Sequence, residues 1–135
     1  MELAFLLDTN TLIYIRRSKP KSVREAFDKV PVGETAISII TFGELVFGVM
    51  KSSQREGGMK QLEQLSETIP VLPLPQEAGN FYGSVRAELE ASGQSIGNND
   101  LWIAAHALAL GLTLVTNNEK EFRRVRGLKI ANWTR

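Results

Sequence analysis

Apolar residues occur along this chain in short continuous runs, separated by longer segments in which apolar and polar residues mix with a helical period. The short runs predict buried strands, and the run that contains Pro70 predicts an edge strand or a strand end. The expected strands are residues 3–7, 34–38, 69–72, 112–115 and around 128–130. The expected helices are residues 11–17, 22–30 (opened by a Ser22-x-x-Glu25 capping box), 40–50, 55–67, 76–92, 101–110 and about 119–124. Because strands alternate with helices, the pattern predicts the α/β class, as an α/β/α sandwich around a central, mainly parallel sheet.

The composition is that of an ordinary globular domain, and we expect residues 1–135 to form a single one. The net charge is only +1, so any binding of nucleic acid would depend on local basic patches and not on a global field. The absence of cysteine excludes disulfides and thiolate zinc sites, and a single histidine excludes a multi-histidine metal site. No apolar run approaches the ~20 residues of a membrane span. The N-terminus lacks the basic start of a signal peptide, so we expect a cytoplasmic protein.

Three acidic residues fall at positions that the predicted topology brings to one rim of the sheet. Asp8 directly follows the strand at 3–7, Glu44 lies early in the helix after the second strand, and Asp100 opens the apolar helix at 101–110. In open parallel sheets, ligands bind beyond the carboxyl ends of the strands, and a helix that returns antiparallel to the strands begins at that end. Asn117, directly after the strand at 112–115, belongs to the same rim.

Each of these acids also has a purely structural explanation as part of a helix cap. The cap-like arrangements are Asp8 before the first helix, Thr41-x-x-Glu44, Asn98 with Asp100 in the first turn, and Asn118-x-x-Glu121. Taken one at a time, these residues do not distinguish a cap from a ligand. The functional interpretation rests on the convergence of acids from separate segments.

Converging carboxylates would need a counter-charge. Two like charges about 4 Å apart repel by roughly 4 kcal/mol at an effective dielectric constant of 20. No lysine or arginine stands immediately beside Asp8, Glu44 or Asp100 in the sequence. A site made only of oxygen ligands suits Mg²⁺ or Mn²⁺. Either ion can activate water and neutralise charge on a phosphodiester. The residues therefore predict metal-assisted phosphodiester hydrolysis.

Four segments carry a wider resemblance, in their order and their spacing. They are "LDTN" at 7–10, "TFGELVFGV" at 41–49, "SIGNNDLWIAAHALALG" at 95–111 and "LVTNNEKEFRRVRGLKIANW" at 114–133. Together they resemble the PIN domain and, more narrowly, the VapC toxins of bacterial VapBC toxin–antitoxin pairs. The resemblance covers essentially the whole chain. It implies a compact α/β/α fold and a magnesium- or manganese-dependent ribonuclease.

The resemblance also implies roles for individual residues. Asp8, Glu44 and Asp100 match the acids that hold the metal and carry catalysis. Thr9 and Asn10 would orient Asp8, and Thr116 would buttress the site. Asn117 stands where PIN domains often have a fourth acid, which leaves open whether one or two metal ions bind. Glu121, a few residues further on, is a secondary metal candidate that would act through water.

The same resemblance implies the partners. The substrate would be a structured RNA such as a transfer RNA, and its cleavage would slow translation and growth. The protein would be a homodimer. A cognate VapB-like antitoxin would occupy the active-site groove and bind operator DNA.

Two basic clusters flank the acids in the sequence and are candidates for binding RNA phosphates. They comprise Arg16, Arg17, Lys19, Lys21 and Arg24 near the start, and Lys120, Arg123, Arg124, Arg126 and Lys129 near the end. The alternative is an ordinary solvated face. The single histidine, His106, lies within the apolar helix, so we expect it in the core or at an interface and not in catalysis.

Two other functions fit parts of the pattern. An aspartyl-nucleophile phosphatase also places an acid after a buried strand, but it usually has a second acid two residues later, where this chain has Asn10. A degenerate PIN domain would bind RNA or protein without cleaving it. The presence of all three acids argues against that second alternative.

Overall fold

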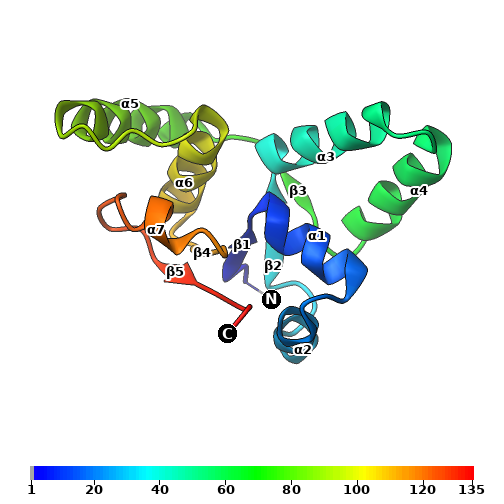
Figure 1. The fold of residues 1–135 in the computed structure, drawn as a ribbon. Coiled ribbons are helices and arrows are strands. Elements are labelled where there is room, and N and C mark those ends of the chain that lie inside the picture. Colours follow the sequence, from blue (N-terminus) through cyan, green and yellow to red (C-terminus); the bar gives the residue numbers. More distant parts are fainter. Residues whose placement is uncertain (1) are drawn as a thin grey trace.

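The computed structural model describes residues 2–135, and over these residues five short strands form one parallel sheet (Figure 1). The strands are β1 (Phe5–Leu7), β2 (Thr35–Ser38), β3 (Val71–Leu72), β4 (Thr113–Val115) and β5 (Ile130–Ala131). They lie side by side in the order β3-β2-β1-β4-β5, and every neighbouring pair is parallel. β3 is an edge strand that begins after Pro70, which confirms the position expected for that proline.

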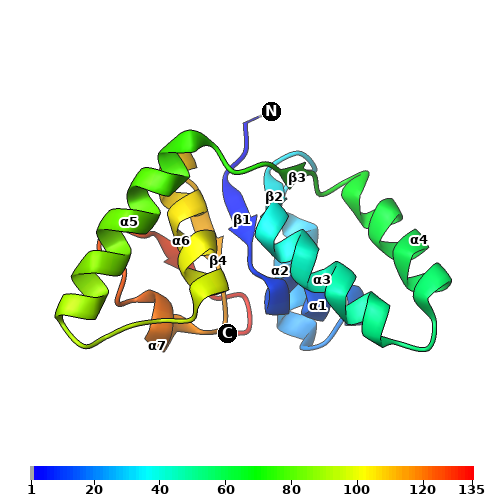
Figure 2. The same ribbon diagram turned by 90° about the horizontal axis from the view of Figure 1, so that it is seen from above.

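Helices cover both faces of this sheet. They are α1 (Thr9–Arg17), α2 (Lys21–Lys29), α3 (Ile39–Lys51), α4 (Arg55–Ser66), α5 (Gln76–Ala91), α6 (Asn98–Leu110) and α7 (Glu119–Phe122). Figure 2 shows α5 and α6 on one side of the strands and α1 to α4 on the other. The α/β/α sandwich with a parallel central sheet, predicted from the sequence, is therefore confirmed.

Two hydrophobic cores, one on each face, follow from the two-residue period of the strands. Neighbouring strand residues point to opposite faces. Thus Leu6 packs into the core under α5, α6 and α7, whereas Leu7 packs into the core under α1 to α4. The pairs Ala36 with Ile37 and Leu114 with Val115 divide in the same way. This double burial explains why the strands have continuous apolar runs instead of alternating ones.

Helix α6 is apolar on nearly every side because it lies against the sheet under α5, and its residues 103–107 are buried. Gly111 ends it in the left-handed conformation, with φ of 67°, as the sequence predicted. Over the described residues, no helix combines the length and the apolar character that crossing a membrane requires.

One predicted cap and two cap-like alternatives do not form. The predicted Ser22 capping box does not form, because α2 begins at Lys21 behind Pro20, which places Ser22 inside the helix. Ser38, not Thr41, caps α3, and Thr41 is buried within the helix. Gly97 precedes α6, so Asn98 is its first helical residue and instead accepts a hydrogen bond from the hydroxyl of Tyr82. In each case the chain enters the helix earlier than the side-chain pattern indicated.

Candidate active site

The carboxyl ends of β1 and β4 lie side by side and define the candidate site. The backbone N–H of Asp8 donates to the carbonyl of Val115 at 3.1 Å, so the residues that follow these two strands are neighbours. Asp8 and Thr116 each come directly after a strand and are both buried. The rim that the sequence predicted is therefore present at the ends of the two central strands.

Asp8 is both a helix cap and a member of the site. It is 6% exposed, and its Oδ1 accepts a hydrogen bond of 2.8 Å from the backbone N–H of Thr11, which caps α1. Burial raises the pKa of Asp8, hydrogen bonds from Thr116 and Thr11 oppose that increase, and the charge of Glu44 adds to it. The two explanations of Asp8 considered from the sequence are thus compatible, since one oxygen caps the helix while the carboxylate remains at the rim.

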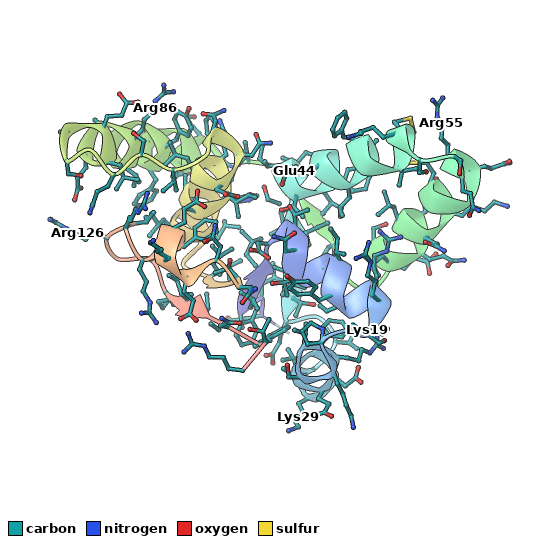
Figure 3. All side chains as sticks on the ribbon, viewed as in Figure 1. Lys19, Lys29, Glu44, Arg55, Arg86 and Arg126 are labelled. Carbon is teal, nitrogen blue, oxygen red and sulfur yellow. The ribbon has the colours of Figure 1, made fainter. Side chains whose placement is uncertain are left out.

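Glu44 lies near the N-terminal end of α3, where Figure 3 labels it on the side nearer α6. Its Oε1 accepts a hydrogen bond of 2.5 Å from the hydroxyl of Thr9, and its Oε2 accepts one of 3.4 Å from the amide of Asn99. The hydrogen bond of Thr9 therefore goes to Glu44, not to Asp8 as the resemblance implied. Because Ser38 caps α3, the capping-box explanation of Glu44 does not apply.

Asp100, in the first turn of α6, faces Glu121 of α7. Burial first, then the charge of Glu121 and a hydrogen bond to it, and finally the charges of Glu44 and Asp8 raise the pKa of Asp100 to about 7. Glu121 is held by the backbone N–H of Gly97, which donates to its Oε1 at 3.0 Å, and by the amide of Asn118. The structure therefore brings Asp8, Glu44, Asp100 and Glu121 within electrostatic reach of one another.

Gly97 borders this pair of carboxylates closely. A Cβ atom at this position would lie 3.7 Å from Oδ2 of Asp100 and 3.8 Å from Oε1 of Glu121, which is ordinary contact distance. A side chain larger than a methyl group would extend toward the two oxygens. Gly97 and Asn99 are thus contacts of the site that the sequence pattern did not single out.

The four carboxylates lack a counter-charge within the described chain. None of them forms a salt bridge with a lysine or arginine of residues 2–135. In the same residues, no three histidine, cysteine or carboxylate side chains stand close enough together to form a ready metal cage. The negative charge of these carboxylates is therefore uncompensated, and their side chains do not form a closed metal cage in this structure.

The other predicted supporting residues have different surroundings. The hydroxyl of Thr116 helps to keep the pKa of Asp8 down and accepts a hydrogen bond of 2.9 Å from the backbone N–H of Asn118. The side chain of Asn117 is exposed, and its carbonyl oxygen accepts hydrogen bonds from Thr134 and Asn132. Asn10 is exposed in the first turn of α1. Thr116 therefore faces the acids, whereas Asn117 contacts the C-terminal segment.

A cleft of about 930 Å³ between α1, α3 and α4 opens beside Glu44, and we call it the arginine cleft. Its lining includes Thr9, Glu44 and three arginines: Arg16, Arg17 and Arg24. The guanidinium of Arg16 donates a hydrogen bond of 2.7 Å to Gln61 of α4. Of the first basic cluster, the arginines thus line the same cleft as Glu44.

The remaining predicted RNA-binding residues lie outside the arginine cleft. Lys19 and Lys21 are exposed, and Lys21 pairs with Glu25. Arg123 forms an ion pair of 2.7 Å with Glu119, and Arg124 donates a hydrogen bond of 3.0 Å to the carbonyl of Ser95. The contact of Arg124 fixes the loop before α6.

His106 is fully buried, as the sequence indicated, and its Nδ1 lies 2.8 Å from the hydroxyl oxygen of Ser38. Burial lowers the pKa of His106, so the ring is neutral at neutral pH.

The comparisons with known proteins agree with this geometry. The model of the family described as PIN domain matches residues 5–128. The chain belongs to the PIN-domain family. Within that family it groups with the VapC ribonucleases. It is 38% identical over 132 residues to ribonuclease VapC1 of Haemophilus influenzae, covering 97% of this chain and 98% of the relative. It is 41% identical to the tRNA(fMet)-specific endonuclease VapC of Shigella flexneri, covering 98% and 99%.

Solved structures of VapBC complexes show the same PIN fold. The VapC-like chain in the structure of VapBC-1 from nontypeable Haemophilus influenzae is 37% identical, with a TM-score of 0.91 and full coverage of both chains. A chain of the DNA-bound VapBC structure from Salmonella typhimurium is 39% identical, with a TM-score of 0.90 and coverage of 97% and 98%. The parallel sheet and its flanking helices are therefore those of VapC-type PIN domains.

Proposed function

We propose that this protein is a divalent-metal-dependent endoribonuclease toxin that cleaves transfer RNA and thereby inhibits translation. The observation that carries the proposal is the group of four carboxylates without a cationic partner, placed beside the arginine cleft. Membership of the VapC ribonucleases supports the reaction type. The tRNA(fMet)-specific name of the Shigella flexneri relative supports transfer RNA, and initiator transfer RNA first. Every residue of the site lies on elements of one sandwich, which supports one PIN domain over residues 1–135.

We infer that Asp8, Glu44 and Asp100 would hold Mg²⁺ or Mn²⁺, with Glu121 acting through water. When bound, such an ion activates water for attack on phosphorus and neutralises charge on the phosphodiester. Asp8 would be a rigidly held ligand, because the backbone N–H of Thr11 donates a hydrogen bond to its Oδ1. Thr9 and Asn99 hold both oxygens of Glu44. Burial and then the neighbouring charge of Glu121 raise the pKa of Asp100 to about 7, so a bound cation would favour its ionised form.

The arginine cleft gives a route for the RNA backbone. Arg16, Arg17 and Arg24 line it together with Glu44, so a phosphate bound there lies next to the acids. Lys19, Lys21, Arg123 and Arg124 would extend the contact at the surface. Replacing Arg17 with Gln should lower the slope of log affinity against log salt concentration by about one unit if Arg17 contacts a phosphate. An unchanged slope would assign Arg17 to an ordinary solvated face.

We propose a VapB-like antitoxin as the protein partner, and operator DNA as a ligand reached through that antitoxin. The similar solved structures from Haemophilus and Salmonella are of VapBC, and the latter is DNA-bound. A homodimer is supported by an apolar stripe on α3, where Ile39, Phe47 and Met50 are 42%, 64% and 40% exposed. Such a stripe is typical of an interface. We place this activity in the cytoplasm.

The decisive experiment measures cleavage of initiator transfer RNA by the purified protein with and without divalent metal. Asp8→Asn and Asp100→Asn should each reduce the rate by about a thousandfold or more, because a bound metal contributes several kcal/mol to the transition state. Asp8→Asn keeps a side chain that can cap α1, so the variant should fold. Glu77→Gln, an exposed acid in the first turn of α5, is the matched control and should cleave normally.

The same assay separates the proposal from its rivals. Metal-independent cleavage, or full activity of either aspartate variant, would overturn the three-acid site. Binding of RNA without cleavage at any metal concentration would favour a non-catalytic PIN module. A phospho-aspartate trapped at Asp8 would favour the phosphatase.

A further inference from the structure

A buried hydrogen bond joins the two helices that carry Glu44 and Asp100. Ser38 and His106 are each 0% exposed, and the Ser38 hydroxyl lies 2.8 Å from Nδ1 of the imidazole. The two residues are 68 positions apart in the chain. Ser38 is at once the last residue of β2 and the cap of α3, because its hydroxyl oxygen accepts the backbone N–H of Ile40 at 3.1 Å.

The Ser38 hydroxyl can pair with either neutral form of the imidazole. A hydroxyl has one proton to donate and two lone pairs with which to accept. The Ser38 oxygen accepts from Ile40 and keeps its own proton and a second lone pair for Nδ1. Burial lowers the pKa of His106, so the ring is neutral and carries its single proton on one of its two nitrogens.

The other side of the ring faces the segment after β3. Nε2 has no hydrogen-bond partner of good geometry among the described residues. The carbonyl of Pro73 is nevertheless close enough to oppose part of the decrease in the pKa of His106, and proline offers no backbone N–H. The Pro73 carbonyl is therefore at most a weak partner of Nε2. The firm contact of the ring is therefore with Ser38.

Each partner lies six residues from an acid of the site. Glu44 follows Ser38 by six positions along α3, and His106 follows Asp100 by six positions along α6. Nearer the rim, Asn99 of α6 donates to Glu44 of α3 at 3.4 Å. The two helices are thus joined twice, once at the site by an exposed contact and once in the core by a buried one.

We infer that His106 is a positioning residue for the nuclease site: its hydrogen bond to the Ser38 cap sets α3 against α6 and so fixes Glu44 relative to Asp100. Only the expected effect of His106 on RNA cleavage rests on the proposed function. The structural link itself involves no substrate and no metal.

The first test uses the fact that His106 is the only histidine of the chain. Protein labelled with ¹⁵N at histidine gives one pair of ring-nitrogen signals. We expect a single neutral tautomer, no titration near pH 6.5, and a shift of the Nδ1 signal in Ser38→Ala but not in Ser38→Thr. A ring that titrates at its ordinary pKa and ignores Ser38→Ala would overturn the link.

The second test asks whether the link positions the acids. In His106→Asn the side-chain amide can place a polar atom near the position of Nδ1, whereas His106→Leu removes the hydrogen bond. We expect His106→Leu to weaken Mn²⁺ binding about tenfold, as loss of supporting contacts around metal ligands commonly does. It should also lower kcat for RNA cleavage with KM unchanged. His106→Asn should restore most of both.

Ile103→Ala is the matched control, because Ile103 is equally buried on the same helix but has an apolar side chain that cannot hydrogen-bond to Ser38. If Ile103→Ala weakens Mn²⁺ binding as much as His106→Leu, the effect is general loss of packing and the positioning role is overturned. Mn²⁺ binding of His106→Leu equal to that of the wild type would overturn it too. The ring-nitrogen and Mn²⁺ measurements need no RNA. They can therefore support or overturn the positioning role of His106 even if the protein does not cleave RNA.

Discussion

The two halves of the acid site are built differently. Asp8 and Glu44, on the side of α1 and α3, are held by neutral donors: the Thr11 amide and the Thr116 hydroxyl for Asp8, and Thr9 for Glu44. On the side of α6 and α7, Asp100 faces a second carboxylate, Glu121. Burial first, and then the charge of Glu121, raise the pKa of Asp100 to about 7.

This difference indicates which carboxylates a bound cation would affect most. Neutral donors stabilise a carboxylate in its ionised form, whereas a second carboxylate destabilises it. Burial raises the pKa of both aspartates, but hydrogen-bond donors oppose that increase at Asp8, whereas the charge of Glu121 adds to it at Asp100. We therefore expect metal to change the protonation of Asp100 more than that of Asp8.

The largest expected effect concerns the stability of the metal-free protein against pH. In the folded state the pKa of Asp100 is about 7, above its ordinary 3.8, so folding favours the protonated form. The resulting stabilisation is complete below about pH 4 and is lost as the pH rises through 7. At pH 8 Asp100→Asn should therefore melt a few degrees above the wild type, since about 1 kcal/mol shifts the Tm of a domain of this size by about 4 °C.

Thermal melts from pH 5 to 8, with and without Mg²⁺, would check this. The comparison with Asp100→Asn isolates Asp100, because His106 is common to both proteins. His106 has the opposite dependence: its lowered pKa means that stability is lost as the pH falls below about 6.5. Equal melting temperatures of wild type and variant at every pH would show that ionisation of Asp100 does not destabilise the folded protein.

A smaller effect is expected from Glu121→Gln, which removes the neighbouring charge with the largest effect on the pKa of Asp100. The pKa of Asp100 should move back toward 3.8, which ¹³C NMR of the labelled carboxyl would follow. Cleavage should fall by about tenfold, as expected for a group that supports the metal through water. A loss as large as that of Asp100→Asn would instead make Glu121 a direct ligand. An unchanged pKa of Asp100 would mean that the two halves are not built differently.

The smallest effect is expected in the other half, from Thr9→Val. Thr9 donates to Glu44 at 2.5 Å, and losing one such hydrogen bond costs about 1 kcal/mol, or about fivefold in kcat/KM. Thr9→Ser keeps the hydroxyl and should cleave RNA nearly as well as the wild type. If both variants were equally impaired, the methyl group and not the hydroxyl of Thr9 would be what matters.

Much of this architecture is already present in local sequence patterns. The continuous apolar runs at 3–7 and 112–115 predicted strands buried on both faces, and Leu6 and Leu7 indeed enter opposite cores. The all-apolar helix ended by Gly111 was likewise predicted correctly. These features depend on residues close together in the chain, so periodicity and turn chemistry are enough to predict them.

The candidate site was only partly predictable for the same reason. That Asp8 lies at the rim follows from the direction of a parallel strand. The hydrogen-bond partners of the acids do not follow from it, because Thr9 and Glu44 are 35 residues apart and Gly97 and Glu121 are 24 apart. Helix starts were misjudged where a cap-like residue, such as Ser22, stood just inside the first turn of the helix.

The sequence by itself determined the layers, the parallel sheet and the placement of acidic residues after strands and at helix starts, because each depends on local period and chain direction. The tertiary structure alone decided that Thr9 contacts Glu44, that Asp100 faces Glu121, and that Asn117 turns to the C-terminal segment. Such contacts depend on how α3, α6 and α7 pack across the sheet. Packing is a property of side chains from distant segments that meet only in the folded chain.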